Sequence, residues 1–204
     1  YKCNHAPHAM KLSTIIFATV CYAAALPTYA KEPAQAPAPA RMQYENWQQL
    51  PPQVRAALLF IMAAGFDSMA ATEEQGLDPD SAKAHALFLE LVLKLDVSFM
   101  DNGQDRLYFE TMLNINRDRL TALQALPESA GHAEVEAIRT QHAEKLKAVK
   151  KQYGYENIDT IVTRRLPGLQ QKYMEQCVKA HPHSVRAALR LFAEKLREES
   201  IMQH

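Results

Sequence analysis

The segment LFLELVLKLDVSFM, residues 87–100, decides the fold class, because its apolar residues fit two kinds of secondary structure. With a period of 3.6 residues, the polar side chains fall into one stripe on an otherwise buried helix: Glu90, Lys94, Ser98 and Asp101. Asp96 falls outside this stripe. Because burying so apolar a run lowers the free energy of the protein, we expect it to lie at the centre of the core.

With a period of two, the same segment alternates apolar and polar side chains as a strand does. The sequence Asp-Asn-Gly at 101–103 would then turn a hairpin over residues 87–116. Three features favour the helix. The lead-in SAKAHA is rich in alanine, leucine outnumbers the β-branched residues, and Asp78 with Pro79 supplies a cap and a first-turn proline. We predict a helix over 79–100 and keep the hairpin as the alternative.

Glycines and prolines divide the rest of the chain into further helices. Five glycines fall where an apolar period breaks: Gly76, Gly103, Gly131, Gly154 and Gly168. The predicted helices span residues 52–73, 79–100, 104–125, 132–153, 157–165, 167–180 and 184–200. Pro51-Pro52 starts the first helix and Ser184 caps the last, while Gly65 is expected to permit close contact between helices. Short links predict an all-α, single-domain helical bundle of about six to seven helices over residues 44–204.

The N-terminal part of the chain has the pattern of an export signal and a spacer. Residues 1–9 are expected to precede the natural start at Met10. Residues 10–30 contain a basic Lys11, the apolar stretch LSTIIFATVCYAAAL and small residues before a cleavage site after Ala30. This apolar stretch is shorter than the roughly 20 residues of a spanning helix. Residues 31–43, rich in proline and alanine, predict an extended spacer, so we expect a periplasmic or secreted protein.

Composition and missing motifs narrow the classes of function. The 23 basic residues balance the 23 acidic ones, so no strong field towards nucleic acid is expected. The chain contains no phosphate-binding glycine loop, HExxH, G-x-S-x-G, CxxC or CxxCH pattern. This disfavours NTPases, common zinc proteases, serine hydrolases, thiol oxidoreductases and c-type cytochromes. The patterns favour a protein that uses no cofactor and is not an enzyme.

Cys177 is the only cysteine beyond residue 30, so no internal disulfide is expected. It lies four residues before His181, and His183 follows across a proline. A thiolate and two imidazoles in this pattern could bind zinc, copper or haem iron, and the thiol could also be an activated nucleophile. Cys177 equally continues an apolar stripe with Leu169 and Tyr173, which favours packing in the core. We expect packing and keep the metal or haem site as the alternative.

The leading functional hypothesis is an exported helical protein-interaction module that binds another protein in the cell envelope or secreted space. Envelope assembly, immunity or inhibition, and chaperone-like action all fit this class, and so does a homodimer. The candidate partner surface is basic: Lys147, Lys150, Lys151, Arg164 and Arg165. The alternative is a helical-bundle metal or haem carrier, or a small metalloenzyme, that uses Cys177, His181 and His183.

Overall fold

The computed structural model describes residues 44–101 and 103–203, and in these residues a short 3-10 helix and six α-helices pack together without any strand. They are η1 (Trp47–Gln49), α2 (Pro52–Glu74), α3 (Ala82–Val92), α4 (Gln104–Gln124), α5 (His132–Tyr153), α6 (Ile158–Ala180) and α7 (Val185–Ile201). The predicted all-α bundle is confirmed, and the alternative hairpin over 87–116 is wrong. The predicted signal peptide, cleavage site and spacer lie outside the described residues.

Several helix ends follow the local signals in the sequence. Pro52 occupies the first position of α2, where its missing N–H leaves no hydrogen bond unmade. The Ser184 hydroxyl caps α7 by accepting a hydrogen bond from the Ala187 N–H at 3.2 Å. Gly154 ends α5 with a φ of 77°, a conformation that favours glycine. These three predictions are confirmed.

The helix predicted over 79–100 begins later than expected. Ser81, and not Asp78, is its N-cap, and the Ser81 hydroxyl accepts a hydrogen bond from the Ala84 N–H at 3.2 Å. Asp78 instead accepts a hydrogen bond from the Asp80 N–H at 3.1 Å, within the turn that precedes α3. The aspartate therefore supports a turn, a role that short polar side chains fill as readily as a cap.

The same predicted helix also ends early, because α3 stops at Val92 and residues 93–100 form turns. Asp96, which did not fit the helical stripe, accepts a hydrogen bond from the Ser98 N–H at 2.8 Å. Aspartate and serine side chains offer the backbone such local partners, and this competes with continuation of a helix. The one irregular position in the sequence pattern thus lies in the segment where the helix has given way to turns.

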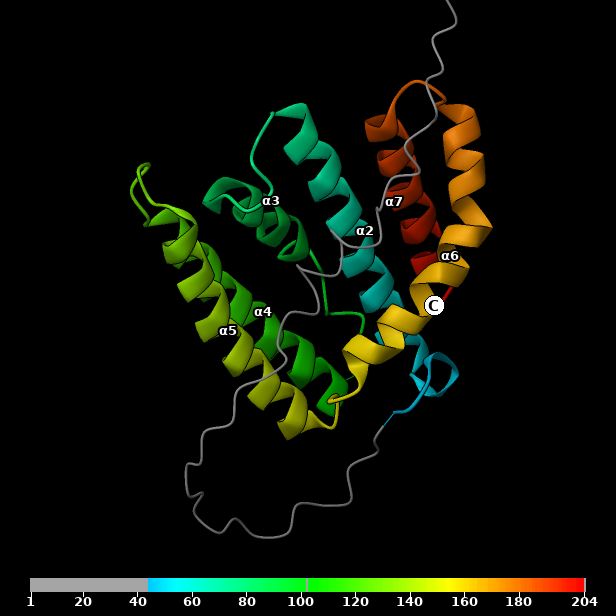
Figure 1. Cartoon of the computed structure of the whole chain (residues 1–204). Coiled ribbons are helices and arrows are strands. Elements are labelled where there is room, and N and C mark those ends of the chain that lie inside the picture. Colours follow the sequence, from blue (N-terminus) through cyan, green and yellow to red (C-terminus); the bar gives the residue numbers. More distant parts are fainter. Residues whose placement is uncertain (1–43, 102, 204) are drawn as a thin grey trace, which may run out of the picture.

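Two helices predicted over 157–165 and 167–180 form the single helix α6, so the predicted break at Gly168 is wrong. Pro167 lies inside α6 and has no N–H to donate to the carbonyl four residues earlier. A proline in this position bends a helix, and Figure 1 shows α6 changing direction between its yellow and orange parts. The bend lets the second half of α6 lie beside α7 while the first half turns towards α4 and α5.

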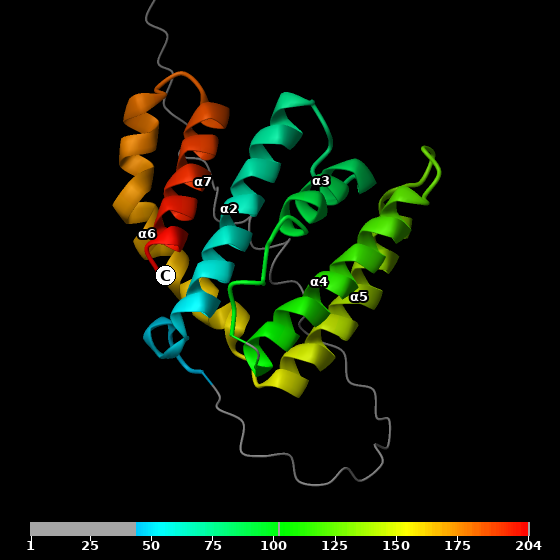
Figure 2. The same ribbon diagram turned by 180° about the vertical axis from the view of Figure 1, so that it is seen from behind.

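Two antiparallel helix pairs flank α2 and α3 (Figures 1 and 2). α4 packs against α5, α6 packs against α7, and α3 joins α2 to α4. The most extensive contact is between α2 and α7, and there Phe66 meets Phe192 edge to face with 4.6 Å between ring centroids. The beginning and end of the described chain are therefore packed together in the core.

The centre of this core is α2 and not the segment 87–100. α2 carries eleven buried residues, whereas α3 carries four. In the turns after α3, Leu95 and Met100 are buried but Phe99 is 39% exposed. α2 also has the length and apolar composition of a membrane-spanning helix, and 56% of its most apolar stretch is buried by the other helices. Core helices of soluble proteins share both properties.

Candidate ligand-binding pocket

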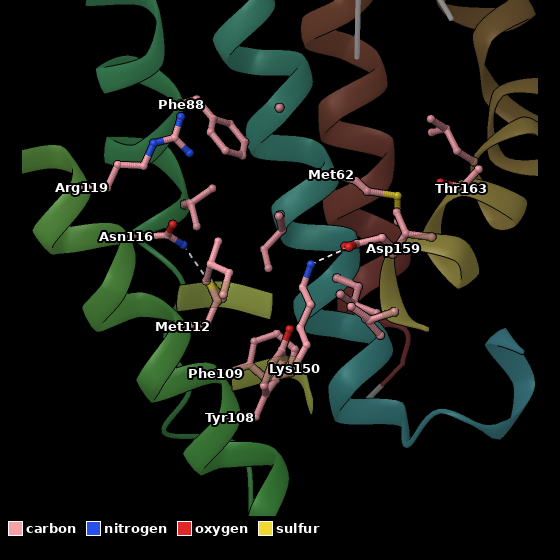
Figure 3. Close-up of a pocket in the computed structure, with 18 of the residues that line it drawn as sticks. Met62, Phe88, Tyr108, Phe109, Met112, Asn116, Arg119, Lys150, Asp159 and Thr163 are labelled. Carbon is pink, nitrogen blue, oxygen red and sulfur yellow. Dashed lines mark hydrogen bonds and ion pairs between the residues drawn. The ribbon is translucent and has the colours of Figure 1, made fainter. Parts of the chain in front are cut away.

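An apolar pocket with a volume of about 150 Å³ lies between α2, α4 and the first half of α6, with further walls from α3 and α5 (Figure 3). Its apolar lining consists of Leu58, Ile61, Met62, Phe66, Phe88, Val92, Phe109, Met112, Leu146, Ile158, Val162 and Leu166. A cavity of about this volume with aliphatic and aromatic walls holds one group of the size of benzene.

Helical periodicity places the lining residues on two main walls. On α2 they recur at steps of one, three or four, so that they share one face: Leu58, Ile61, Met62, Gly65 and Phe66. On α4 the lining residues are Tyr108 and a stripe at steps of three, four and three: Phe109, Met112, Asn116 and Arg119. The α4 stripe begins apolar and ends polar, which makes the pocket amphiphilic along this helix.

Gly65 leaves space in the α2 wall. A methyl group at this position would lie 3.9 Å from Phe88 Cε2, which is an ordinary contact distance. The predicted role of Gly65 in permitting close helix contact is therefore wrong, because an alanine would fit between α2 and α3. The missing side chain instead leaves that space on the pocket face of α2.

An ion pair lies on the α5 and α6 side of the pocket. Lys150 Nζ is 2.5 Å from Asp159 Oδ2, and the two side chains are 19% and 35% exposed. Lys150 was expected on an exposed basic surface, but it turns towards the pocket, as Figure 3 shows. Each charge has its partner here, so the pair adds no net charge to this side of the pocket.

Arg119 contributes an uncompensated charge at the other side. Its side chain extends from α4 towards Phe88 (Figure 3), and the residue is only 7% exposed. Its Nε is buried without a hydrogen-bond partner, and within residues 44–101 and 103–203 no ion pair or hydrogen bond to the guanidinium is present. Burial and the nearby charge of Arg139 lower the pKa of Arg119 to about 10, so it remains a cation at neutral pH.

Asn116 lies one turn before Arg119 and is also buried. Its amide nitrogen donates a hydrogen bond to Met112 Sδ at 2.8 Å. A thioether sulfur is a weak acceptor, so this contact satisfies the amide less well than an oxygen would. Asn116 and Arg119 together give one part of an otherwise apolar pocket two side chains whose nitrogens lack good acceptors.

His85 on α3 lies within the electrostatic reach of Arg119. It is 4% exposed, and its Nε2 is buried without a hydrogen-bond partner in the described residues. Burial, followed by the charges of Arg119 and Arg139, lowers the pKa of His85 to about 4. His85 is therefore neutral at physiological pH and adds no further positive charge around Arg119.

The three predicted metal ligands lie in different environments, one buried and two exposed. Cys177 is fully buried in the core, and burial raises the pKa of its thiol, which is the reverse of an activated nucleophile. His181 and His183 are exposed in the turn after α6. Across the described part of the chain, no three His, Cys, Asp or Glu side chains gather closely enough to hold a metal ion. The structure thus does not bring these three residues together, and the packing role expected for Cys177 is confirmed.

The predicted basic surface is divided between solvent and interior. Lys147, Lys151 and Arg164 are exposed, whereas Lys150 pairs with Asp159 as described above. Arg165 also turns inward, where its guanidinium carbon lies 5.6 Å from the centre of the Trp47 ring. Three of the five residues are therefore exposed to solvent.

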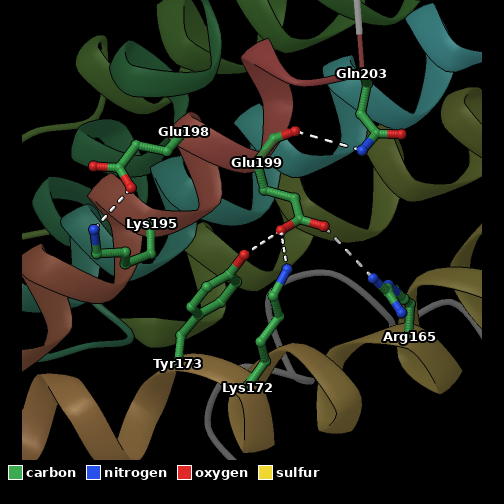
Figure 4. A network of polar contacts seen from close by, with 7 residues as sticks. All are labelled: Arg165, Lys172, Tyr173, Lys195, Glu198, Glu199 and Gln203. Atoms are coloured by element: carbon green, nitrogen blue, oxygen red, sulfur yellow. Dashed lines mark hydrogen bonds and ion pairs between the residues drawn. The ribbon is translucent and has the colours of Figure 1, made fainter.

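A second buried charge, Glu199 on α7, was not predicted as a special residue, and it shows how this fold normally treats such groups (Figure 4). Its carboxylate accepts hydrogen bonds from Lys172 Nζ at 2.7 Å and from the Tyr173 hydroxyl, and Arg165 Nη2 lies 3.8 Å away. Burial alone would raise the pKa of Glu199, but these donors outweigh burial and lower it. Partners from α6 thus compensate this buried carboxylate.

The same sequence signal could have identified Glu199 and Arg119. Glu199 continues the apolar stripe of Leu189, Phe192 and Leu196 at the next three-residue step, and Arg119 continues the stripe of Met112 and Asn116 in the same way. A charged residue at a core position of a helix needs a partner.

Comparison of the chain with protein-family models, with curated proteins and with solved structures found no match.

Proposed function

We propose that the protein is an exported helical binding protein that takes a small, largely apolar ligand into the pocket between α2, α4 and α6. The observation that carries this proposal is the pocket itself, about 150 Å³ in volume and walled by aliphatic and aromatic side chains from five helices. Small-molecule sites are concave and mostly apolar, with a few polar groups that fix orientation. The proposal includes export because residues 10–30 have the pattern of a signal peptide.

The polar groups around the pocket suit binding. Asp159 and Lys150 form an ion pair at 2.5 Å, so their two charges balance each other in the lining of the pocket. Asn116 and Arg119 are donors without a reactive partner beside them. These side chains can orient a ligand by hydrogen bonds and charge, which is the role that polar groups have in a carrier or sensor.

The test is saturable binding of phenyl compounds to the purified protein, followed by ligand-observed NMR and calorimetry. The probes are 3-phenylpropan-1-ol and 3-phenylpropionate, whose rings match the pocket volume. Val162→Trp fills the pocket and should weaken binding by at least about tenfold, since the ring of the ligand and the indole would compete for one space. Val178→Trp places the same side chain on the exposed face of the same helix, where Val178 is 49% exposed, and should leave binding unchanged.

The proposal fails if neither probe saturates the protein, or if Val162→Trp binds as well as the unmodified protein while its circular dichroism shows an intact fold. Binding lost equally in both tryptophan variants would also count against the pocket, because Val178 lies outside it.

Binding of a partner protein remains a separate proposal, and the exposure of Lys147, Lys151 and Arg164 is the observation that favours it. The partner would lie in the envelope or secreted space, in line with the predicted export. Replacing all three residues with glutamate should release such a partner in affinity purification from the envelope fraction. Unchanged recovery of every copurifying protein would remove this surface from consideration.

A further inference from the structure

The pocket contains one group whose chemistry indicates what kind of ligand it accepts. Arg119 is 93% shielded from solvent, its side chain points towards Phe88 at the pocket wall, and no described residue pairs with its guanidinium. A buried charge without a partner is strongly destabilising in proteins. We therefore expect Arg119 to have a function other than stabilising the fold.

Arg55 and Arg165 also have a buried Nε without a hydrogen-bond partner, but of these three arginines only Arg119 is buried as a whole residue. Glu199 is as deeply buried as Arg119, at 8% and 7% exposure, yet three side chains of α6 approach its carboxylate. The Lys150 ammonium, which also lines the pocket, is likewise paired, with Asp159. Arg119 lies on the same type of stripe, but it lines the pocket, and no described side chain forms an ion pair or a hydrogen bond with it.

The protein's own carboxylates near Arg119 are already engaged. The charge of Glu136 on α5 reaches Arg119, but Glu136 Oε2 lies 3.0 Å from Arg139 Nη1 and forms an ion pair there. The charges of Arg139 and Glu136 therefore balance each other, and the positive charge of Arg119 remains in excess. The group that would balance it is an anion.

We propose that the ligand is a monocarboxylate with an apolar body of about the size of one phenyl ring, and that Arg119 binds its carboxylate while Asn116 supplies a second donor. This inference rests on the binding function proposed above. The planar guanidinium offers two parallel N–H donors that match a carboxylate. A single unpaired cation in a pocket of about 150 Å³ fits one negative charge on a small molecule better than a phosphate ester, which carries more charge and more polar oxygens.

The experiment compares two ligands that differ only in the head group, 3-phenylpropionate and 3-phenylpropan-1-ol, by calorimetry at pH 7 with the full chain. The unmodified protein should bind the acid roughly 10- to 100-fold more tightly, as expected for hydrogen bonds to charged groups. Arg119→Met keeps the length of the side chain without its charge and should reduce this preference to about twofold or less. Binding of the alcohol should stay within about threefold, because the apolar walls are unchanged.

Arg117→Met is the matched control, since Arg117 lies on the same helix but is exposed and donates to Asn114 Oδ1 at 2.7 Å. It should retain the full preference for the acid. Arg119→Met should also raise the thermal midpoint of the ligand-free protein, because it removes an unpaired buried charge. Arg119→Gln provides the same comparison of acid and alcohol if the methionine variant does not fold.

The outcomes separate the two proposals. If acid and alcohol bind the unmodified protein equally well, the pocket remains a ligand site and the carboxylate assignment is wrong. If the preference for the acid survives in Arg119→Met or Arg119→Gln, Arg119 is not the group that recognises it. If neither compound binds, the proposed function itself is refuted. A preference for the acid that disappears with Arg119 and persists without Arg117 supports both.

Discussion

Replacing His85 with leucine should remove a defined part of the protein's sensitivity to acid. His85 is 4% exposed, and charged or titratable groups face it from every side: Arg119 on α4, Arg139 and His132 on α5, and Asp80 in the turn before α3. Burial and the two arginines disfavour the imidazolium, and Asp80 opposes them only in part. The net result is a pKa near 4 in place of the ordinary value of 6.5.

The magnitude follows from linkage between protonation and folding. Below pH 6.5 the unfolded chain protonates His85, whereas the folded protein does so only near pH 4. The stability that depends on neutral His85 is therefore fully present above pH 6.5, is lost progressively as the pH falls from 6.5 towards 4, and is absent below pH 4. Because one pKa unit corresponds to about 1.4 kcal/mol, the loss between pH 7 and pH 4.5 should be about 2 kcal/mol of unfolding free energy.

The assay is urea unfolding of the unmodified protein and of His85→Leu at both pH values. The decrease in unfolding free energy from pH 7 to pH 4.5 should be about 2 kcal/mol smaller in the variant. His183→Leu, in the exposed turn after α6, is the control and should keep the full decrease. Equal decreases in all three proteins would refute the reasoning, as would an NMR titration in which the His85 ring protonates near pH 6.5.

Three further substitutions test other parts of the structure. Gly65→Ala should raise the unfolding free energy by roughly 0.5–1 kcal/mol, because the new methyl group fits 3.9 Å from Phe88 and alanine is the better helix former. A loss of stability in chemical denaturation would show that the pocket wall is tighter than described. Cys177→Ala should lower the unfolding free energy by about 1 kcal/mol, and the Cys177 thiol, whose pKa burial raises, should react with Ellman's reagent only after denaturation. Glu199→Gln should cost about 1–3 kcal/mol at pH 7, and because the pKa of Glu199 is lowered in the folded state, this difference should shrink as the pH falls through that pKa. The exposed neighbour Glu198, replaced in the same way, should cost a few tenths of a kcal/mol, and a similar loss in both variants would contradict the role given to Glu199.

Local chemistry made most of the helix boundaries predictable. Pro52, Ser184 and Gly154 act through their own backbone or side-chain geometry, so their effects do not depend on the rest of the fold. The prediction for α6 was wrong because a local signal competed with packing. Pro167 would end an isolated helix, but packing of both halves of α6 retains the helix and leaves a bend.

The segment 87–100 shows the opposite error, because its overall apolarity concealed a local signal. Asp96 was visible as the one side chain outside the stripe, and its hydrogen bond to the Ser98 N–H belongs to the turns that follow α3. Apolar content predicted correctly that parts of this run would be buried. The apolar content could not show that α2, which has many small alanine side chains, would be surrounded by other helices on more sides than the segment 87–100.

The pocket could be predicted only in part, because periodicity shows which residues share a face of one helix but not which helices meet. The stripe that ends in Arg119 was present in the sequence, and so was the stripe that ends in Glu199. Whether either charge would find a partner depends on α6 and α5, which no local rule places. Lys150 was misassigned for the same reason, since Asp159 reaches it only through the turn between α5 and α6.

The packing of α2 against α7 sets an order of events during synthesis. About 110 residues separate the end of α2 at Glu74 from the start of α7 at Val185. At 5–20 residues per second, a ribosome needs roughly 6–20 s to make them. During this interval the helix with the most buried residues has been synthesised while its main partner does not yet exist. Molecular chaperones that shield α2 would be most valuable to the chain in this period.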